Sequence, residues 1–221
     1  MKLNKKIKLL ISADGGAGSG KTTASKLIAK KFGLKLLTSG LLYRYVAFKL
    51  LNSKIIHSKK NLLANIIKKI NIKKLKNKNL YAPEVTNYAS IIAKKKNIRD
   101  LLKKFQIKFS NNRLCIIEGR DIGTVIIPNA DLKLFFKCSL KVKAERRFKE
   151  FKKINKKISF NEVKKAIKLR DLHDTKRKFS PLRPAKGAVI VDTSRINIKQ
   201  MESKLTKVVL NVLDNKYGRN I

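Results

Sequence analysis

The sequence predicts an α/β fold built on a five-stranded parallel sheet, because short apolar runs alternate with helical patterns. The apolar runs cover residues 7–13, 34–37, 114–117, 132–138 and 188–191. This alternation is typical of successive βαβ units, in which a helix connects each strand to a parallel neighbour. A chain of 221 residues is long enough for one such domain with a single buried core. We therefore predict three layers, with helices on both faces of the sheet.

The first predicted strand runs directly into a glycine-rich loop. Residues 15–22 fit the pattern G-x-x-x-x-G-K-[ST], in which successive backbone N–H groups face the phosphates of a nucleotide. Lys21 supplies a positive charge for the β and γ phosphates, and the Thr22 hydroxyl is suited to bind Mg²⁺. The residues expected to bind a nucleoside triphosphate are Gly15, Gly16, Ala17, Gly18, Ser19, Gly20, Lys21, Thr22 and Thr23.

The segment after this loop reads as a helix, which the motif requires. Ala24, Leu27, Ile28 and Phe32 share one helical face, and Gly33 is placed to end the helix. This context of strand, loop and helix distinguishes a phosphate-binding loop from a glycine-rich turn that matches by accident.

The net charge of +41 is extreme and would by itself suggest nucleic-acid binding. The chain has 44 lysines against 11 arginines, and the lysines are spread through every helical pattern without interleaved aromatic residues. We therefore interpret the lysines as solvated surface and do not expect nucleic acid as a partner. The alternative, a nucleic-acid-binding module, predicts salt-dependent duplex binding that survives the loss of Lys21.

Cysteine, histidine and hydropathy patterns indicate a cytoplasmic enzyme. Cys115 and Cys138 lie in apolar runs, as expected of packed, reduced thiols in core strands. His57 and His173 have no metal-ligand partners at suitable spacing, so we do not expect a zinc site. No apolar run approaches the length of a membrane span, so we expect no membrane association.

Two segments interrupt the alternating pattern and read as insertions. Residues 52–96 are rich in Lys and Asn, with a turn near residues 76–79. Residues 141–179 read as two helices joined around Lys156 and Lys157, before the Pro-rich segment 180–184. Two such flaps on a rigid sheet are the geometry expected of a kinase that excludes water.

Arginine stands out in a chain whose default cation is lysine, because its planar guanidinium binds phosphate in a fork. Of the eleven arginines, six lie in segments that also carry other motif residues, and Arg99 is a seventh of interest. Arg120 and Asp121 follow the third strand, at the sheet edge where ligands bind in open α/β folds. The alternative is that these residues are surface features only. Arg170 and Asp174 would then form an exposed ion pair, and Arg146 and Arg147 would lie on a solvated helix face.

Five motifs in order resemble the bacterial cytidylate kinase family of P-loop nucleoside monophosphate kinases. They read G-G-A-G-S-G-K-T-T, T-S-G-L-L-Y-R, E-G-R-D-I-G-T-V, A-E-R-R and R-D-L-H-D-T-K-R-K-F-S-P-L-R-P-A. The resemblance covers residues 8 to about 213, and its second half is the more specific. A GTP switch lacks support because no N-K-x-D motif is present, and dephospho-coenzyme A or shikimate kinases would share only the loop.

The resemblance implies a P-loop NTPase fold in one kinase domain, 1–221. Its core would be residues 1–51 and 99–221, with a monophosphate-binding insertion at about 52–98 and a lid at about 146–170. The acceptor phosphate would be held by Ser39, Tyr43, Arg44, Arg120 and Arg177; cytosine would be read by Ser90, Arg99 and Asp121; and the ribose would lie by Arg170 and Asp174. Arg146 and Arg147 match lid positions near the ATP phosphates, so the catalytic set would be Lys21, Arg146, Arg147 and Arg177.

The implied reaction transfers the γ-phosphate of ATP to CMP, with dCMP as a second acceptor and Mg²⁺ as the metal. The sequence departs from the family pattern at Thr38, Glu118 and His173, and its monophosphate insertion is short, with a reduced hairpin near residues 72–84. We expect a monomer with small-molecule nucleotides as its partners.

Overall fold

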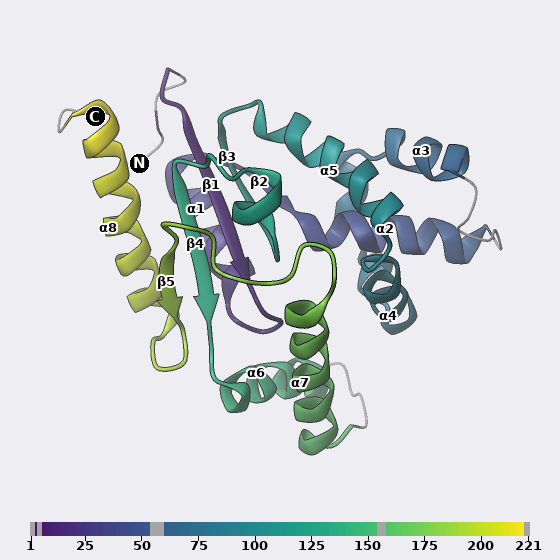
Figure 1. Cartoon of the computed structure of the whole chain (residues 1–221). Helices are drawn as coiled ribbons and strands as arrows, with labels where there is room; N and C mark the ends of the chain where they lie inside the picture. The colour runs from purple at the N-terminus through teal and green to yellow at the C-terminus, as the bar shows by residue number, and fades with distance from the viewer. Residues whose placement is uncertain (1–2, 4–5, 54–59, 154–157, 219–221) are drawn as a thin grey trace. The chain divides into compact units, whose positions relative to one another are not determined.

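The computed structural model describes residue 3 and residues 6–53, 60–153 and 158–218 of the chain (Figure 1). These residues form two compact units. The first unit comprises Met1–Leu36 and Arg113–Ile221, and the second comprises Leu37–Asn112.

Five strands form one sheet, as the sequence predicts. The strands are β1 (Leu9–Gly15), β2 (Lys35–Thr38), β3 (Leu114–Gly119), β4 (Leu132–Lys137) and β5 (Val189–Asp192), in the order β2-β3-β1-β4-β5. β1 pairs in parallel with β3 and β4, and β4 pairs in parallel with β5. The predicted α/β P-loop fold class is therefore confirmed, with strand ends shifted by one or two residues.

The central strand is apolar because it is buried on both faces. All seven residues of β1 are buried, and Leu9, Ile11 and Ala13 are completely inaccessible to solvent. β1 lies between β3 and β4, so neither its edges nor its faces reach water. A continuous apolar run, instead of an alternating one, is what such a strand requires.

Helices of the first unit cover the sheet, and two of them form a separate pair where the sequence analysis expects a lid. α1 (Lys21–Phe32) and α8 (Ile198–Tyr217) pack together and share one hydrophobic core with β1, β3, β4 and β5. Gly33 ends α1 in a left-handed conformation, as predicted. α6 (Leu140–Lys153) and α7 (Phe160–Lys176) pack around a separate small core of Ala144, Val163 and Ile167. The two helices predicted here are therefore present; the junction predicted at Lys156 and Lys157 lies outside the described residues.

The second unit is helical. It contains α2 (Ser39–Asn52), α3 (Lys60–Lys68), α4 (Pro83–Ile92) and α5 (Lys96–Ser110). Two 3₁₀ helices, Ile72–Lys76 and Lys78–Tyr81, occupy the segment where a reduced hairpin is expected. Asn71 and Asn77 begin these turns by accepting hydrogen bonds from the backbone two residues later. The segment is dominated by these local Asn turns and not by strand pairing.

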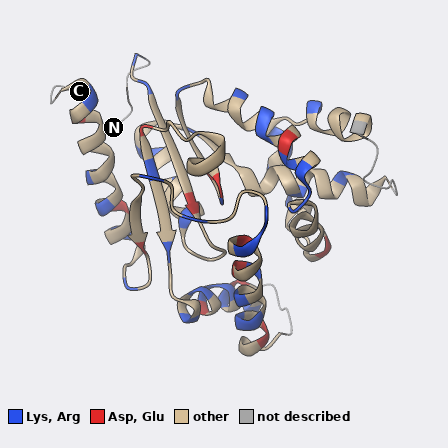
Figure 2. Ribbon diagram, viewed as in Figure 1, with Lys and Arg blue, Asp and Glu red and all other residues tan. Residues whose placement is uncertain are grey.

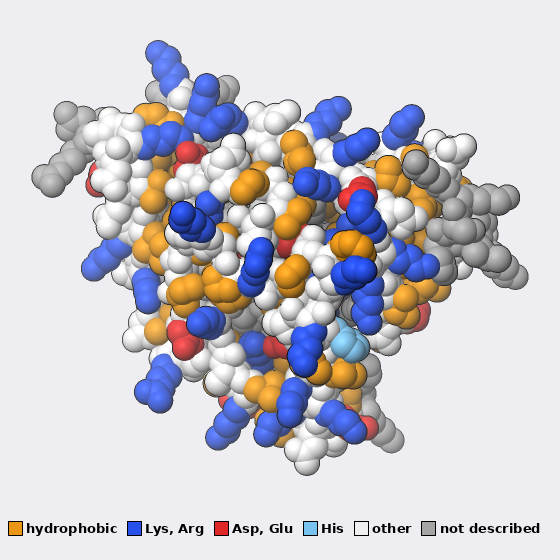
Figure 3. Space-filling view, viewed as in Figure 1, with side chains coloured by type: hydrophobic (Ala, Val, Ile, Leu, Met, Phe, Trp, Pro, Cys, Tyr) orange, Lys and Arg blue, Asp and Glu red, His pale blue; other side chains and the backbone are white. Residues whose placement is uncertain are grey.

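Positive charge is dispersed over the helices of both units, as Figure 2 shows. On the face drawn in Figure 3, Lys and Arg side chains are interspersed with hydrophobic and uncharged surface. This dispersal agrees with the interpretation of the lysines as solvated surface. Among the described helices, none is long and apolar enough to cross a membrane.

Candidate active site

The carboxyl ends of the strands bring functional side chains of the first unit to one edge of the sheet. Since β1, β3, β4 and β5 are parallel, the residues that follow them emerge on the same side. β1 leads into the glycine-rich loop, β3 ends at Glu118 and Gly119, and Thr193 follows β5. The site therefore forms where polar residues follow the apolar runs of the sequence.

The glycine-rich loop adopts a conformation that requires glycine at two positions. Gly18 and Gly20 have φ angles of 69° and 82°, in the left-handed region that side chains disfavour. Gly20 also caps α1, so the N–H groups at the helix start face the loop. Such a helix start carries partial positive charge and binds phosphate well. The backbone of the loop is thus arranged for an anion.

Lys21 lies buried within this loop. Its ammonium group donates a 3.1 Å hydrogen bond to the carbonyl oxygen of Gly16. Burial, reinforced by the charges of Arg120 and Arg170, lowers the pKa of Lys21 to about 7. A bound phosphate would favour the charged form, so the loop is electrostatically complementary to a nucleotide's phosphates.

Thr22 and Glu118 form a polar pair beside the loop that suits a divalent cation. The Thr22 hydroxyl donates a 2.8 Å hydrogen bond to Glu118 Oε2. Glu118 is almost completely buried, and its Oε1 atom has no hydrogen-bond partner among the described residues. A hydroxyl and a buried carboxylate with an unused oxygen are hard oxygen ligands of the kind Mg²⁺ prefers. These two residues therefore fit the magnesium ion that the sequence analysis expects at Thr22.

Asp14 is a buried acid that the sequence analysis did not single out. Its carboxylate accepts hydrogen bonds from the backbone N–H groups of Ile122 and Gly123, at 2.8 Å and 2.7 Å. Burial raises its pKa to about 6, although these two hydrogen bonds oppose the shift. Asp14 therefore fixes the turn that follows Asp121. The sequence signal that could have identified Asp14 is an acidic residue in a strand that is otherwise mostly apolar.

Two acids and two arginines form a cluster at the carboxyl side of β3. Arg120 Nε donates a 2.7 Å hydrogen bond to Asp174 Oδ2, while Arg177 lies 3.5 Å from Asp121 and 3.8 Å from Asp174. α7 ends at Lys176, so Arg177 lies just beyond the helix instead of on its face. Burial tends to raise the pKa of Asp174, but Arg120, Arg170 and Arg177 reverse this and lower it. The structure thus brings these predicted residues together.

The two arginines that are expected near the ATP phosphates, Arg146 and Arg147, differ in their contacts. Arg146 donates hydrogen bonds to the Thr193 hydroxyl at 3.0 Å and to the Thr193 carbonyl oxygen at 2.7 Å, and the same hydroxyl donates to the loop carbonyl of Ser19. Arg147 instead pairs with Glu150 on the same helix and stacks on Phe151. Only Arg146 of this pair is linked to the loop in the described structure. The sequence analysis missed Thr193, although it lies two residues after the apolar run 188–191.

Cys138 is less embedded than the sequence predicts. β4 ends at Lys137, and the Cys138 thiol lies 3.6 Å from Arg146 Nη1, partly exposed. Cys115, in contrast, is buried within β3 as predicted, and burial raises its pKa to about 11. The apolar run 132–138 therefore extends one residue past the strand.

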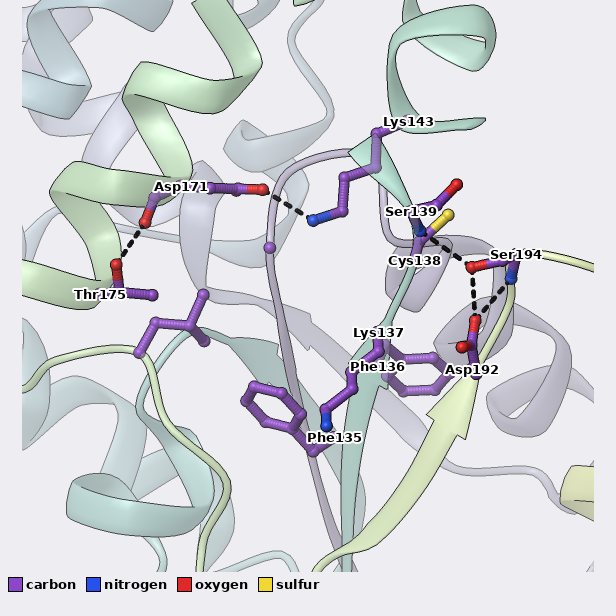
Figure 4. Close-up of a pocket in the computed structure, with 12 residues that line it drawn as sticks. Phe135, Phe136, Lys137, Cys138, Ser139, Lys143, Asp171, Thr175, Asp192 and Ser194 are labelled. Carbon is purple, nitrogen blue, oxygen red and sulfur yellow. Dashed lines mark hydrogen bonds and ion pairs between the residues drawn. The ribbon is translucent and has the colours of Figure 1, made fainter. Parts of the chain in front are cut away.

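A pocket of about 500 Å³ opens beside the loop and the end of β4 (Figure 4). Its lining includes Gly16, Cys138, Ser139, Lys143, Asp171, Thr175, Asp192 and Ser194. Lys143 and Asp171 form a 2.7 Å ion pair at this pocket, and neither was singled out from the sequence. For Asp171, the available sequence signal was its position directly after Arg170 at the start of the R-D-L-H-D motif.

The second unit brings four polar residues together between α2 and α5. Ser39 accepts a hydrogen bond from Gln106, and both side chains are buried. The Arg99 guanidinium lies over the Tyr43 ring, 5.9 Å from its centre, and donates to the carbonyl oxygen of Ala93. Helical spacing explains the arrangement, because residues 39 and 43 lie one turn apart and residues 99 and 106 two turns apart.

Two further predicted residues of this unit have local partners. Arg44 stacks over the Tyr81 ring at 5.0 Å, and the Ser90 hydroxyl donates to the Thr86 carbonyl oxygen on its own helix. α2 begins at Ser39, so Tyr43 and Arg44 lie in its second turn. Their expected roles in binding CMP remain predictions.

Solved structures similar to this chain share its fold. A protein described as TT1252 from Thermus thermophilus aligns with a TM-score of 0.53 and 16% identity, covering 93% of this chain and 98% of the other. Shikimate kinase from Acinetobacter baumannii, solved with shikimate, aligns with a TM-score of 0.50 and 10% identity over 94% of this chain and 98% of the kinase. Identities this low establish the fold alone.

Sequence comparisons give the family. The family model described as cytidylate kinase matches residues 11–211. A cytidylate kinase from Fervidobacterium nodosum is 37% identical over 210 residues, covering 90% of this chain and 95% of that protein. One from Rickettsia felis is 39% identical over 204 residues, covering 92% of each. The loop, the arginine and aspartate cluster and these matches agree that the chain is a phosphotransferase and belongs to the cytidylate kinase family.

Proposed function

We propose that this protein transfers the γ-phosphate of ATP to CMP, and also to dCMP, giving ADP and the corresponding diphosphate. The observation that carries the proposal is the phosphate loop facing the ends of β3 and β5, with the Arg120, Asp174 and Arg177 cluster in the same unit. The loop suits the donor phosphates, and the cluster suits an anionic acceptor. Family membership adds cytidylate as the acceptor.

The acceptor phosphate is already an anion, so the reaction needs no general base. The main difficulty is to bring two polyanions together in line, and catalysis therefore depends on positioning and positive charge. Lys21 and the N–H groups of the loop would hold the donor phosphates, and Arg146 would add charge beside Thr193. Thr22 and Glu118 would hold Mg²⁺, which neutralises charge on the transferring phosphate when it is bound.

Polar and charged residues of each unit are proposed to bind CMP. In the first unit, Arg120 and Arg177 would hold its phosphate, Arg170 and Asp174 its ribose, and Asp121 the base amine. In the second unit, Ser39, Tyr43 and Arg44 would bind phosphate, and Ser90 and Arg99 would bind the base. Asp174 orients Arg120 through their ion pair, which lowers the cost of ordering that side chain on binding.

The biological setting is part of the same proposal. We propose that the enzyme acts as a monomer in the cytoplasm. Both cysteines are present as thiols, with Cys115 buried, as suits a reducing compartment. Nucleotides, and not nucleic acid, are its proposed partners.

An ADP-release assay with CMP tests the proposed reaction, with ATP alone as the control for hydrolysis. We expect ADP release to depend on CMP and to fall by about 10³-fold or more in Lys21→Ala, because the variant loses charge on the transferring group. Circular dichroism establishes that the variant is folded. A folded Lys21→Ala protein with near-native turnover would contradict the assignment of the loop.

A further inference from the structure

The Asp171 carboxylate lies directly on the phosphate loop. Its Oδ1 atom accepts a 3.1 Å hydrogen bond from the Ala17 backbone N–H, and its Oδ2 atom is 2.7 Å from Lys143 Nζ. Figure 4 shows Asp171 and Lys143, which both line the pocket, extending toward one another from α7 and α6. A negative group from the lid therefore contacts a donor that the loop offers to phosphate.

The contact is close because Gly16 has no side chain. A Cβ atom built on Gly16 would lie 2.8 Å from Asp171 Oδ1 and 3.1 Å from Lys143 Nζ. Both charged groups thus lie against the backbone of the loop. A carboxylate oxygen and a phosphate oxygen are acceptors of the same kind, and both need the Ala17 N–H to point at them. Asp171 and a bound phosphate therefore compete for this donor.

Lys143 has the opposite relation to a bound nucleotide. Its side chain is only 13% exposed, and Asp171 is the carboxylate that neutralises it in this structure. When an anion replaces Asp171 at the loop, the ammonium group is already beside that anion and needs a new partner. A charge of this kind, partly shielded from water, interacts strongly with a phosphate.

We infer that Lys143 is a further ATP-binding residue, and that Asp171 is a competing counterion which the phosphates of ATP displace from the Ala17 N–H. The inference rests on the proposed use of ATP as donor and is independent of the acceptor. It concerns binding alone and requires no additional chemical step. Asp171 therefore lowers the apparent affinity for ATP, since part of the binding energy displaces it.

A purely structural ion pair between α6 and α7 is the alternative. In that case Lys143→Met and Asp171→Asn would act in the same direction, because each removes one half of the same pair. Competition instead predicts opposite directions, weaker ATP binding without Lys143 and tighter binding without the Asp171 charge. The sign of the two effects therefore distinguishes the two explanations.

Isothermal titration of the full-length protein with Mg-ATP, in the absence of CMP, measures these effects. We expect Lys143→Met to raise the Kd by about 10-fold or more, because it removes a charge-assisted hydrogen bond to phosphate. Asp171→Asn should lower the Kd by about 3- to 10-fold, because the neutral amide competes less well. Lys143→Arg should retain most of the affinity. Inorganic tripolyphosphate, titrated in parallel, should show the same order because the effect lies at the phosphates.

Asp192→Asn is the matched control for charge. Asp192 lines the same pocket but bonds to Ser194 and has no described contact with the loop, so its loss should change the Kd by less than about 2-fold. If Lys143→Met fails to fold, the double variant Lys143→Met/Asp171→Asn replaces it. Compared with Asp171→Asn, the double variant should bind ATP about 10-fold more weakly.

Weaker ATP binding in both single variants, or unchanged binding in Lys143→Met, would overturn the inference. The inference would also be overturned if Asp192→Asn tightened ATP binding as much as Asp171→Asn does. The loss of any negative charge near the pocket would then explain the effect. A wild-type protein that binds ATP but does not phosphorylate CMP would refute the proposed acceptor only. A wild-type enzyme that phosphorylates CMP, with Lys143→Met binding ATP normally, would refute this inference only.

Discussion

Arg177 Nη2 lies 3.5 Å from Asp121 Oδ1, and each side chain is about nine-tenths buried. A buried arginine in a chain with 44 lysines indicates that this position needs a guanidinium. Its Nη1 atom also lies 3.8 Å from Asp174, so one planar group faces two carboxylates. Asp121 and Asp174 thereby hold Arg177 in place before an anion arrives.

Arg177→Lys keeps the charge but loses the fork that can face two acids and a phosphate together, so we expect kcat/KM for CMP to fall by about 10- to 100-fold. Steady-state kinetics with varied CMP measures the change. Arg183→Lys, at an exposed arginine nearby in the sequence, should leave it unaltered. Equal kinetics for Arg177→Lys and wild type would mean that Arg177 serves only as a cation.

Glu118 should set the enzyme's requirement for Mg²⁺. Glu118→Gln removes the negative charge next to Thr22 while keeping a side chain of similar size. We therefore expect the Mg²⁺ concentration for half-maximal activity to rise by about 10-fold or more. Glu118→Asp should restore part of the affinity. An unchanged Mg²⁺ titration in a folded Glu118→Gln protein would show that this carboxylate does not serve the metal.

Lys21 should couple ATP binding to proton uptake. Its pKa of about 7 in the free protein means that most molecules carry a neutral amine at pH 8. Bound phosphates favour the ammonium form, so we expect uptake of about 0.5 to 1 proton at pH 8 and almost none below pH 6. ATP affinity should accordingly fall as pH rises from 7 to 9.

Titrations in buffers of different ionisation enthalpy measure this uptake. Lys21→Arg is the control, because a guanidinium stays charged throughout this range and should take up no proton. The same uptake at pH 8 in Lys21→Arg would assign the proton to another group. Uptake near zero in the wild type would contradict a lowered pKa for Lys21.

Most of the sheet and the donor loop could be predicted because local sequence determines them. Buried parallel strands require apolar runs, and the loop requires glycine at Gly18 and Gly20, where φ is positive. The same reasoning correctly placed Arg120 and Asp121 after β3. These features depend on residues that are neighbours in the chain.

The partners of the site residues could not be predicted, because they join distant segments. Asp171 contacts Ala17 across 154 residues, and Thr193 contacts Ser19 across 174. Neither pair has a spacing that signals contact in the sequence. The end of α7 at Lys176 could not be predicted either. Arg170, Asp174 and Arg177 have the spacing of residues on one helix face, yet Arg177 lies just past the end of the helix.

The preference for cytidylate tests the central claim most directly. A carboxylate at Asp121 suits the exocyclic amine of cytosine but leaves the O4 atom of uracil facing an acid, so buried polar groups would be unpaired with UMP. The measurement is kcat/KM for CMP, dCMP, UMP, AMP and GMP with ATP as donor, in wild type and in Asp121→Asn. We predict that the wild type prefers CMP over UMP by about 10²-fold or more, and that Asp121→Asn reduces this ratio. Equal use of CMP and UMP by the wild type would contradict the account.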